Sequence, residues 1–168
     1  MNLQDPNTRR TTLQIAFLLF LFAVPCLIDR NPIQTDLKRF NNDTIVPVAR
    51  QEKRAHDALI EALKKCDADA DCAARAFGAY GDEMRKCAGR VRSASTKTPE
   101  IKAVQDGWRA YFEACADNEE QRKQAIAGHD TAATQACKDR NADVAAVREK
   151  LDTQLKKLIA SHGLEAAR

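Results

Sequence analysis

The sequence predicts an all-α fold, an up-down-up-down four-helix bundle preceded by an N-terminal membrane segment. Alanine is abundant, while glycine, proline and aromatic residues are few, a composition that favours closely packed helices over a β-sandwich. Apolar residues recur every three or four positions in four blocks of similar length, which indicates amphipathic helices. Short breaks at Pro99 and Gly128 favour antiparallel neighbours over the alternative, a long coiled coil or helical hairpin.

Residues 1–30 are predicted to be an anchor or signal segment. An apolar run without charge covers residues 13–28 and follows two arginines, as expected for a membrane-targeting element. The run has 16 residues, whereas a spanning helix needs about 17–25. We favour an uncleaved anchor, because no A-x-A cleavage site follows the run. The alternatives are a cleaved signal peptide and a lipoprotein acylated at Cys26.

The rest of the chain is predicted to be a linker, residues 31–42, and a helical domain, residues 43–168. Pro32 and a mixture of polar residues indicate the linker. The first helix is expected over residues 43–66, where a polar residue can cap the start. Pro47 falls in the first turn of that helix, where its missing N–H removes no helical hydrogen bond.

The second block, about residues 71–94, has the most regular apolar stripe of the chain. Asp71 is a suitable N-cap for a helix that starts there. The spacing of the stripe alternates between four and three residues. Its members are Ala73, Phe77, Tyr80, Met84, Cys87 and Val91.

The third block opens at Thr98, Pro99 and Glu100, which offer a capping hydroxyl, a proline at the first helical position and an acid in the first turn. An aromatic group on this helix is predicted to belong to the core instead of forming a ligand patch. It consists of Trp108, Tyr111 and Phe112. Gly128 can end the helix, and Asp130 can cap the next one.

The fourth block is expected to end in a Schellman motif at His162, Gly163 and Leu164. A glycine at the stop supplies the left-handed residue, and the leucine behind it can fold back on the helix.

Five of the six cysteines lie in the helical domain, and their number favours disulfides in an oxidising compartment. The first choice pairs Cys66 with Cys72 and Cys115 with Cys137, because all four lie toward the same end of an up-down bundle. The crossed pairing of Cys66 with Cys137 and Cys72 with Cys115 stays open. Cys87 lies too far along the axis and is predicted to be a free thiol.

No catalytic, cofactor-binding or metal-binding set is predicted. The sequence has no C-x-x-C, no glycine-rich phosphate loop and no local signature of a nucleophile with its base. Glu52 and His56 lie one turn apart, but no second Glu-x-x-His element faces them. From residue 31 onward the chain carries 24 basic and 22 acidic residues, which gives no case for nucleic acid. No small-molecule substrate is evident.

A polar stretch interrupts the apolar stripe of the third block near the end that carries four cysteines. We expect it to be exposed and to form a contact surface. Its charged members are Asp117, Glu119, Glu120, Arg122 and Lys123.

Three segments of the chain resemble helix starts and stops in a loosely defined set of secreted or lipid-anchored bacterial helical proteins of unassigned function. They are Phe40–Pro47, Thr98–Ile101 and Ser161–Leu164. This resemblance implies a bundle and an envelope location. The segment WRAYFEAC, residues 108–115, is also similar to the tail of small periplasmic lysozyme-inhibitor domains.

The sequence therefore predicts a non-enzymatic protein held to a membrane through residues 13–28. Its body would lie in the periplasm or extracellular space and act as a spacer or bind another envelope protein. The alternatives are an inhibitor of a lysozyme-like wall-degrading enzyme and a spanin-like phage lysis subunit.

Overall fold

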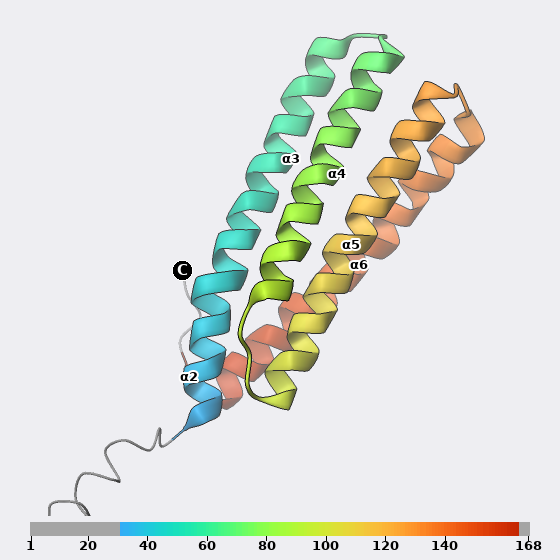
Figure 1. Ribbon diagram of the computed structural model, residues 1–168. Helices are drawn as coiled ribbons and strands as arrows, with labels where there is room; N and C mark the ends of the chain where they lie inside the picture. Colours follow the sequence, from blue (N-terminus) through green and yellow to red (C-terminus); the bar gives the residue numbers. More distant parts are fainter. Residues whose placement is uncertain (1–30, 165–168) are drawn as a thin grey trace, which may run out of the picture. The chain divides into compact units, whose positions relative to one another are not determined.

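The computed structural model describes residues 31–164, and every regular element among them is helical. The elements are α2 (Pro32–Arg39), the π-helical turn η1 (Phe40–Ile45), α3 (Val46–Cys66), α4 (Ala70–Ser93), α5 (Pro99–Ala127) and α6 (Thr131–Ser161). The four long helices run alternately up and down (Figure 1). The predicted all-α class and helical bundle are confirmed.

None of the helices within residues 31–164 is long and apolar enough to cross a membrane. The apolar run over residues 13–28, and Cys26 within it, lie outside the described residues.

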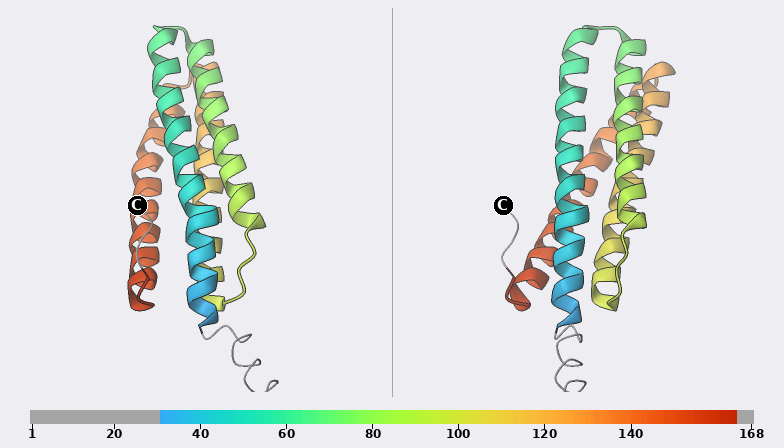
Figure 2. Two further views of the ribbon diagram at one scale, coloured as in Figure 1. Left: turned by 90° about the vertical axis from the view of Figure 1, so that its left-hand side faces the viewer. Right: turned by 60° about the vertical axis from the view of Figure 1, so that its left-hand side comes forward.

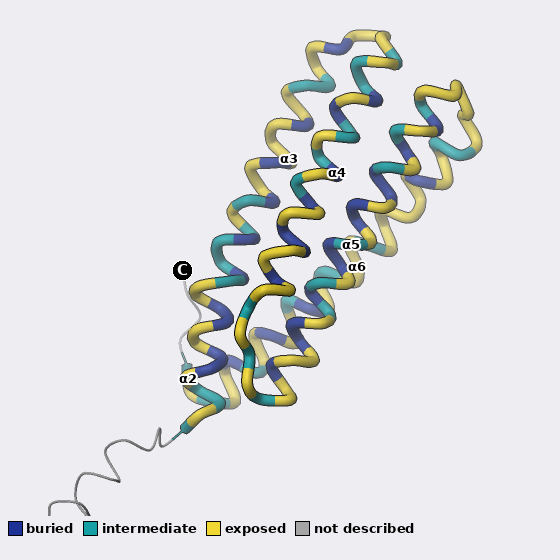
Figure 3. Tube along the Cα trace, in the orientation of Figure 1, coloured by how far each residue is buried: buried dark blue, intermediate teal, exposed yellow. Residues whose placement is uncertain are grey.

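The linker predicted over residues 31–42 is wrong, because this segment is helical and belongs to the core. α2 and η1 lead directly into α3, so that one helical rod extends from Pro32 to Cys66. Leu37 and Phe40 are fully buried in the main core cluster. In Figure 3 buried positions continue along this rod below the start of α3.

The π-helical turn lies just before Pro47. A proline at this position has no N–H to donate to the carbonyl of Asp43, and its ring would collide with that carbonyl in a regular α-helix. In the structure the Val46 N–H instead donates to the Asn41 carbonyl, five residues earlier. The wider turn accommodates the proline without ending the helix, so the first long helix needs no N-cap at residue 42 or 43.

α2 holds two distant parts of the chain. The Asp36 side chain accepts hydrogen bonds from the Lys97 N–H at 2.7 Å, the Thr98 N–H at 2.9 Å and the Thr98 hydroxyl at 3.1 Å. Asp36 therefore satisfies donors just before the first turn of α5, where the Thr98 side chain makes no cap hydrogen bond. The Gln34 side-chain amide donates to the His162 carbonyl at the end of α6.

Aspartate side chains cap the starts of α4 and α6. The predicted cap at Asp130 is confirmed, since its side chain accepts the Ala133 N–H at 2.9 Å. In α4 the cap is Asp69 and not Asp71, because Asp69 accepts the Cys72 N–H at 3.0 Å. The helix therefore starts two residues earlier than the sequence indicated.

The predicted ends of α5 and α6 are confirmed, with one change of residue. At the end of α6, Gly163 has a positive φ and the Leu164 N–H donates to the Ile159 carbonyl at 3.1 Å, which is a Schellman motif. At the end of α5 the left-handed residue is His129, while Gly128 keeps a negative φ.

The core is densest where α4 meets α5, and it thins along the first half of α6. α4 and α5 lie close together at Gly81, where a Cβ would be in van der Waals contact with the Ala116 carbonyl oxygen at 3.4 Å. Before its last three turns, α6 buries only Cys137, and it leaves Val147 exposed. The predicted core role of Trp108, Tyr111 and Phe112 is confirmed, since all three are buried against one another.

Candidate functional site

A groove of about 1020 Å³ lies between α3 and α6. It forms because α3 packs on α4 and α6 packs on α5, while α6 is inclined to α3 (Figure 2). Aliphatic and aromatic side chains supply part of its lining, namely Val46, Leu59, Tyr80, Tyr111 and Val144. Charged side chains from both helices line the rest, which is the usual mixture of a binding site.

Glu52 connects the floor of the groove to its α6 wall. Its side chain is buried, and its Oε1 accepts the Tyr111 hydroxyl at 2.6 Å. The Glu52 Oε2 lies 3.1 Å from the Arg148 Nη2, so one carboxylate contacts both α5 and α6. His56, one turn along α3, packs its ring edge against Tyr80. The Glu52 carboxylate is thus engaged by a hydroxyl and a guanidinium.

The buried thiols of the bundle are poor nucleophiles. Burial raises the pKa of Cys115 to about 11; the charges of Glu52 and Glu119 act in the same direction, and a hydrogen bond with Tyr111 opposes them. Burial likewise raises the pKa of Cys87 to about 12. Both groups are protonated at neutral pH, and a thiol reacts as its thiolate. Cys87 is free, as predicted.

One of the two predicted disulfides is present. Cys66 and Cys72 are bonded, with their Cα atoms 5.3 Å apart. Cys115 and Cys137 are free, so their predicted bridge is wrong, and so is the crossed alternative. The register of α5 against α6 explains this, because the Asn118 side chain donates to the Cys137 carbonyl at 3.0 Å. Cys137 is thus level with residues 118–122, and Cys115 lies about one turn further along.

The predicted contact surface is wrong for two of its five residues. Asp117 is exposed, and Glu120 and Lys123 are half-buried and paired with each other at 3.3 Å. Glu119 and Arg122, in contrast, are only 4 % and 7 % exposed. The polar stretch therefore does not interrupt the buried face of α5, because these two residues continue it.

Glu119 and Arg122 form a buried ion pair at one end of the groove. The Arg122 Nη1 lies 3.2 Å from the Glu119 Oε2, and the Arg122 Nη2 donates to the Cys137 carbonyl at 3.2 Å. The guanidinium also lies over the Phe77 ring, 4.7 Å from its centroid. Burial raises the pKa of Glu119, while the Arg122 charge and a hydrogen bond with Asn141 oppose the shift.

A signal in the sequence could have identified this pair. Counting from Phe112, the positions of Cys115, Glu119, Arg122 and Ala125 are spaced by three or four residues and are all buried. The helical period is therefore unbroken, and only the polarity of its members changes.

Among residues 31–164, no group of three or more His, Cys, Asp or Glu side chains is placed to hold a metal ion. In the segment that resembles lysozyme-inhibitor tails, Trp108, Tyr111, Phe112 and Cys115 all face the core. The groove offers apolar surface, fixed polar groups and charged rims, which suit the binding of a partner. Comparison of the chain with protein-family models, with curated proteins and with solved structures finds no match.

Proposed function

We propose that this protein is a non-enzymatic, membrane-anchored envelope protein whose bundle binds another envelope protein in the groove between α3 and α6. The open groove is the observation that carries the proposal. The apolar run over residues 13–28 supports the anchor. The disulfide between Cys66 and Cys72 supports an oxidising compartment, with the body in the periplasm or extracellular space.

The dimensions of the groove favour an amphipathic helix as its occupant. On α3 the lining extends from Val46 to Leu59, about 20 Å along the axis. On α6 it extends from Asn141 to Asp152, about 16 Å along the axis. Two antiparallel walls of this length with an apolar floor suit helix-in-groove recognition.

The rims of the groove indicate the charges of that helix. The α3 rim carries the exposed cations Arg50 and Lys53. The α6 rim carries Glu149 and Asp152, while Arg148 is directed to Glu52. The bound helix would therefore place acidic residues toward α3 and basic residues toward α6.

Site-specific photo-crosslinking in cells that produce the protein tests this proposal. A photoreactive amino acid is placed in the groove at Ala49 or Ala145, and on the outside of α4 at Ala79 as the matched control. We expect both groove positions to crosslink the same protein through a peptide from an amphipathic helix. Charge reversal of Glu149 and Asp152, on the α6 rim, should lower the yield. Equal crosslinking from Ala79, or none from the groove, would contradict the proposal.

The two other functions considered for this chain have their own tests. Inhibition of lysozyme by the purified protein would favour the inhibitor. An elongated coiled-coil particle in small-angle scattering would favour the spanin-like lysis subunit.

A further inference from the structure

The charges of the described residues are divided unequally between the two halves of the bundle. The contacts of Gln51 with Glu83 and of Asn118 with Asn141 show which residues lie level with one another. A cut at that level divides the described residues into two halves. The proximal half contains α2 and consists of residues 31–50, 86–114 and 144–164. The distal half consists of residues 51–85 and 115–143. The proximal half has 13 basic and 7 acidic residues, and the distal half has 10 and 14. Their net charges are therefore +6 and −4.

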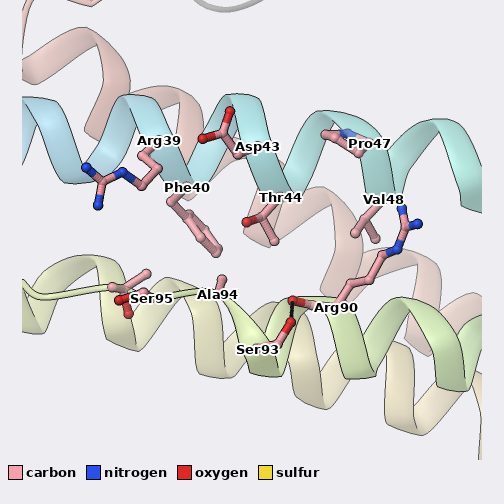
Figure 4. A pocket seen from close by; sticks show the side chains of 11 residues that line it. Arg39, Phe40, Asp43, Thr44, Pro47, Val48, Arg90, Ser93, Ala94 and Ser95 are labelled. Carbon is pink, nitrogen blue, oxygen red and sulfur yellow. Dashed lines mark hydrogen bonds between the residues drawn. The ribbon is translucent and has the colours of Figure 1, made fainter.

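Two adjoining hollows collect cations on one face of α2, α3 and α4; three of these cations belong to the proximal half, and Lys53 and Arg54 lie one turn beyond the cut. The first, of about 340 Å³, lies between η1 and the end of α4. Figure 4 shows Arg39 and Arg90 at its two ends, with Thr44 directed from the upper helix toward Ser93 on the lower one. Asp43 is the only acidic residue in its lining.

The second hollow, of about 470 Å³, has no acidic residue in its lining and shares Arg90 with the first. It is lined by Pro47, Arg50, Lys53, Arg54 and Arg90. We call the five cations of the two hollows the basic face; they are Arg39, Arg50, Lys53, Arg54 and Arg90.

Most cations of the basic face form no salt bridge within the described part of the chain; Arg39 and Arg54 act only at longer range, on Asp36 and Glu83. All five cations are exposed. Of these five cations, only Lys53 forms a salt bridge within residues 31–164, at 3.1 Å with Asp57. Other cations in both halves, by comparison, pair with a nearby carboxylate, among them Lys64, Arg85, Lys86, Arg92 and Lys123. Adjacent exposed cations repel one another, and a surface that carries negative charge relieves this repulsion.

We propose that the basic face binds the anionic headgroups of a phospholipid bilayer, so that the bundle lies along the membrane. This inference rests on the membrane anchor of the proposed function. Only three residues lie between Ile28, at the end of the apolar run, and Pro32 at the start of α2, so the chain limits the distance between their Cα atoms to about 14 Å. Such a tether would keep the start of α2, and with it the basic face, within reach of the headgroups.

The arrangement of charge favours lipid over nucleic acid. The described residues have a net charge of only +2, and their excess positive charge lies in the half next to the tether. The first hollow places arginines beside threonine and serine hydroxyls, which together offer several hydrogen-bond donors to a phosphate group. A tethered surface also needs little affinity of its own, because the anchor raises its effective concentration at the bilayer.

Energy transfer from the single tryptophan, Trp108, tests the inference in the full-length protein. Trp108 is buried in the proximal half and serves as the donor, and dansyl-labelled headgroups in lipid nanodiscs serve as acceptors. We expect more transfer in discs that contain phosphatidylglycerol than in discs of phosphatidylcholine alone. Added salt should remove the difference, because it screens charges at the surface.

Two matched triple variants identify the residues responsible. Replacing Arg50, Arg54 and Arg90 by glutamine should shift the docking equilibrium about 100-fold, because each cation near an anionic bilayer contributes about fivefold. The control replaces by glutamine three exposed cations that lie outside the basic face, toward the far end of the bundle, and should retain the wild-type transfer. They are Lys65, Arg75 and Lys138.

The possible results distinguish a failure of the basic face to bind lipid from a failure of the anchor. Equal transfer in both kinds of disc, or an equal loss in the two triple variants, would overturn the inference. Displacement by duplex DNA at a lower phosphate concentration than the lipid would overturn it in favour of nucleic acid. Protein that leaves the neutral discs but stays with the anionic ones would contradict the anchor and support the basic face.

Discussion

Asp36 joins α2 to the start of α5, and replacing it would measure what α2 contributes to the fold. Asp36→Ala removes the acceptor of three hydrogen bonds from Lys97 and Thr98. A hydrogen bond to a charged group contributes about 1.5–3 kcal/mol, but these three share one oxygen and are not additive. We therefore expect a loss of about 2–4 kcal/mol at neutral pH in urea unfolding followed by far-UV circular dichroism.

The pH dependence separates the charge of Asp36 from its shape. Burial acts to raise the pKa of Asp36, but hydrogen bonds from Thr98 and Lys97 and the charge of Arg39 outweigh it, so the pKa is lowered. The folded state then binds fewer protons than the unfolded state. The stabilisation is present above the unfolded pKa of about 3.9 and is lost as the pH falls through the folded pKa.

Asp36→Asn keeps the shape and an acceptor but not the charge. We expect its loss relative to wild type to be about 1–2 kcal/mol at pH 7 and to shrink below about pH 4. Asp43→Asn is the matched control, because Asp43 is exposed on the same rod and forms no salt bridge within residues 31–164. An Asp36→Ala protein as stable as the control, or an Asp36→Asn deficit that persists at low pH, would refute the role of Asp36.

Three further predictions concern two helical glycines, the buried ion pair and a buried thiol. Gly89→Ala should stabilise the protein by about 0.5–1 kcal/mol, because its Cβ would meet no atom within 4 Å. Gly107→Ala should raise the stability less or lower it, since its Cβ would lie 2.7 Å from a leucine methyl group of α6; thermal unfolding ranks the two. Arg122→Met should cost about 3 kcal/mol at pH 7 by leaving Glu119 buried without its partner. Because burial raises the pKa of Glu119, this loss should be smaller in urea unfolding at pH 4, and an equal loss at both pH values would contradict the ion pair. The Cys115 thiol should resist alkylation at pH 8 until the protein unfolds, and mass spectrometry that finds equal labelling rates in buffer and in urea would contradict its burial.

The features that sequence analysis predicted correctly depend on local structure. The cap at Asp130 and the Schellman ending at Gly163 are determined by a few neighbouring residues. The bond between Cys66 and Cys72 also belongs to this group, because six residues separate its ends and a short turn brings them together.

The features that it missed depend on departures from the usual pattern. Phe40 and Ile45 are five positions apart, a spacing that fits the π-helical turn and not the α-helical period, so the apolar stripe of the rod was not recognised. Glu119 and Arg122 keep the helical period but are charged, and a search for apolar residues alone places them on the surface. Their burial depends on a partner in the same layer, which spacing does not reveal.

The remaining features depend on how whole helices are placed. The bridge between Cys115 and Cys137 fails because of the register of α5 against α6, and a shift of one turn is enough to separate two thiols. The groove depends on the inclination of α6 to α3, which the amphipathic pattern of either helix leaves open.

The position of α2 determines how the bundle would respond to mechanical load. A pull on the chain at residue 31 acts first on α2, where Asp36 holds the start of α5 and Gln34 holds the end of α6. The load is therefore shared among hydrogen bonds to two other helices before it reaches α3. A single-molecule stretching experiment from this end would meet one cooperative rupture, whereas a chain attached at α3 alone would peel away one helix at a time.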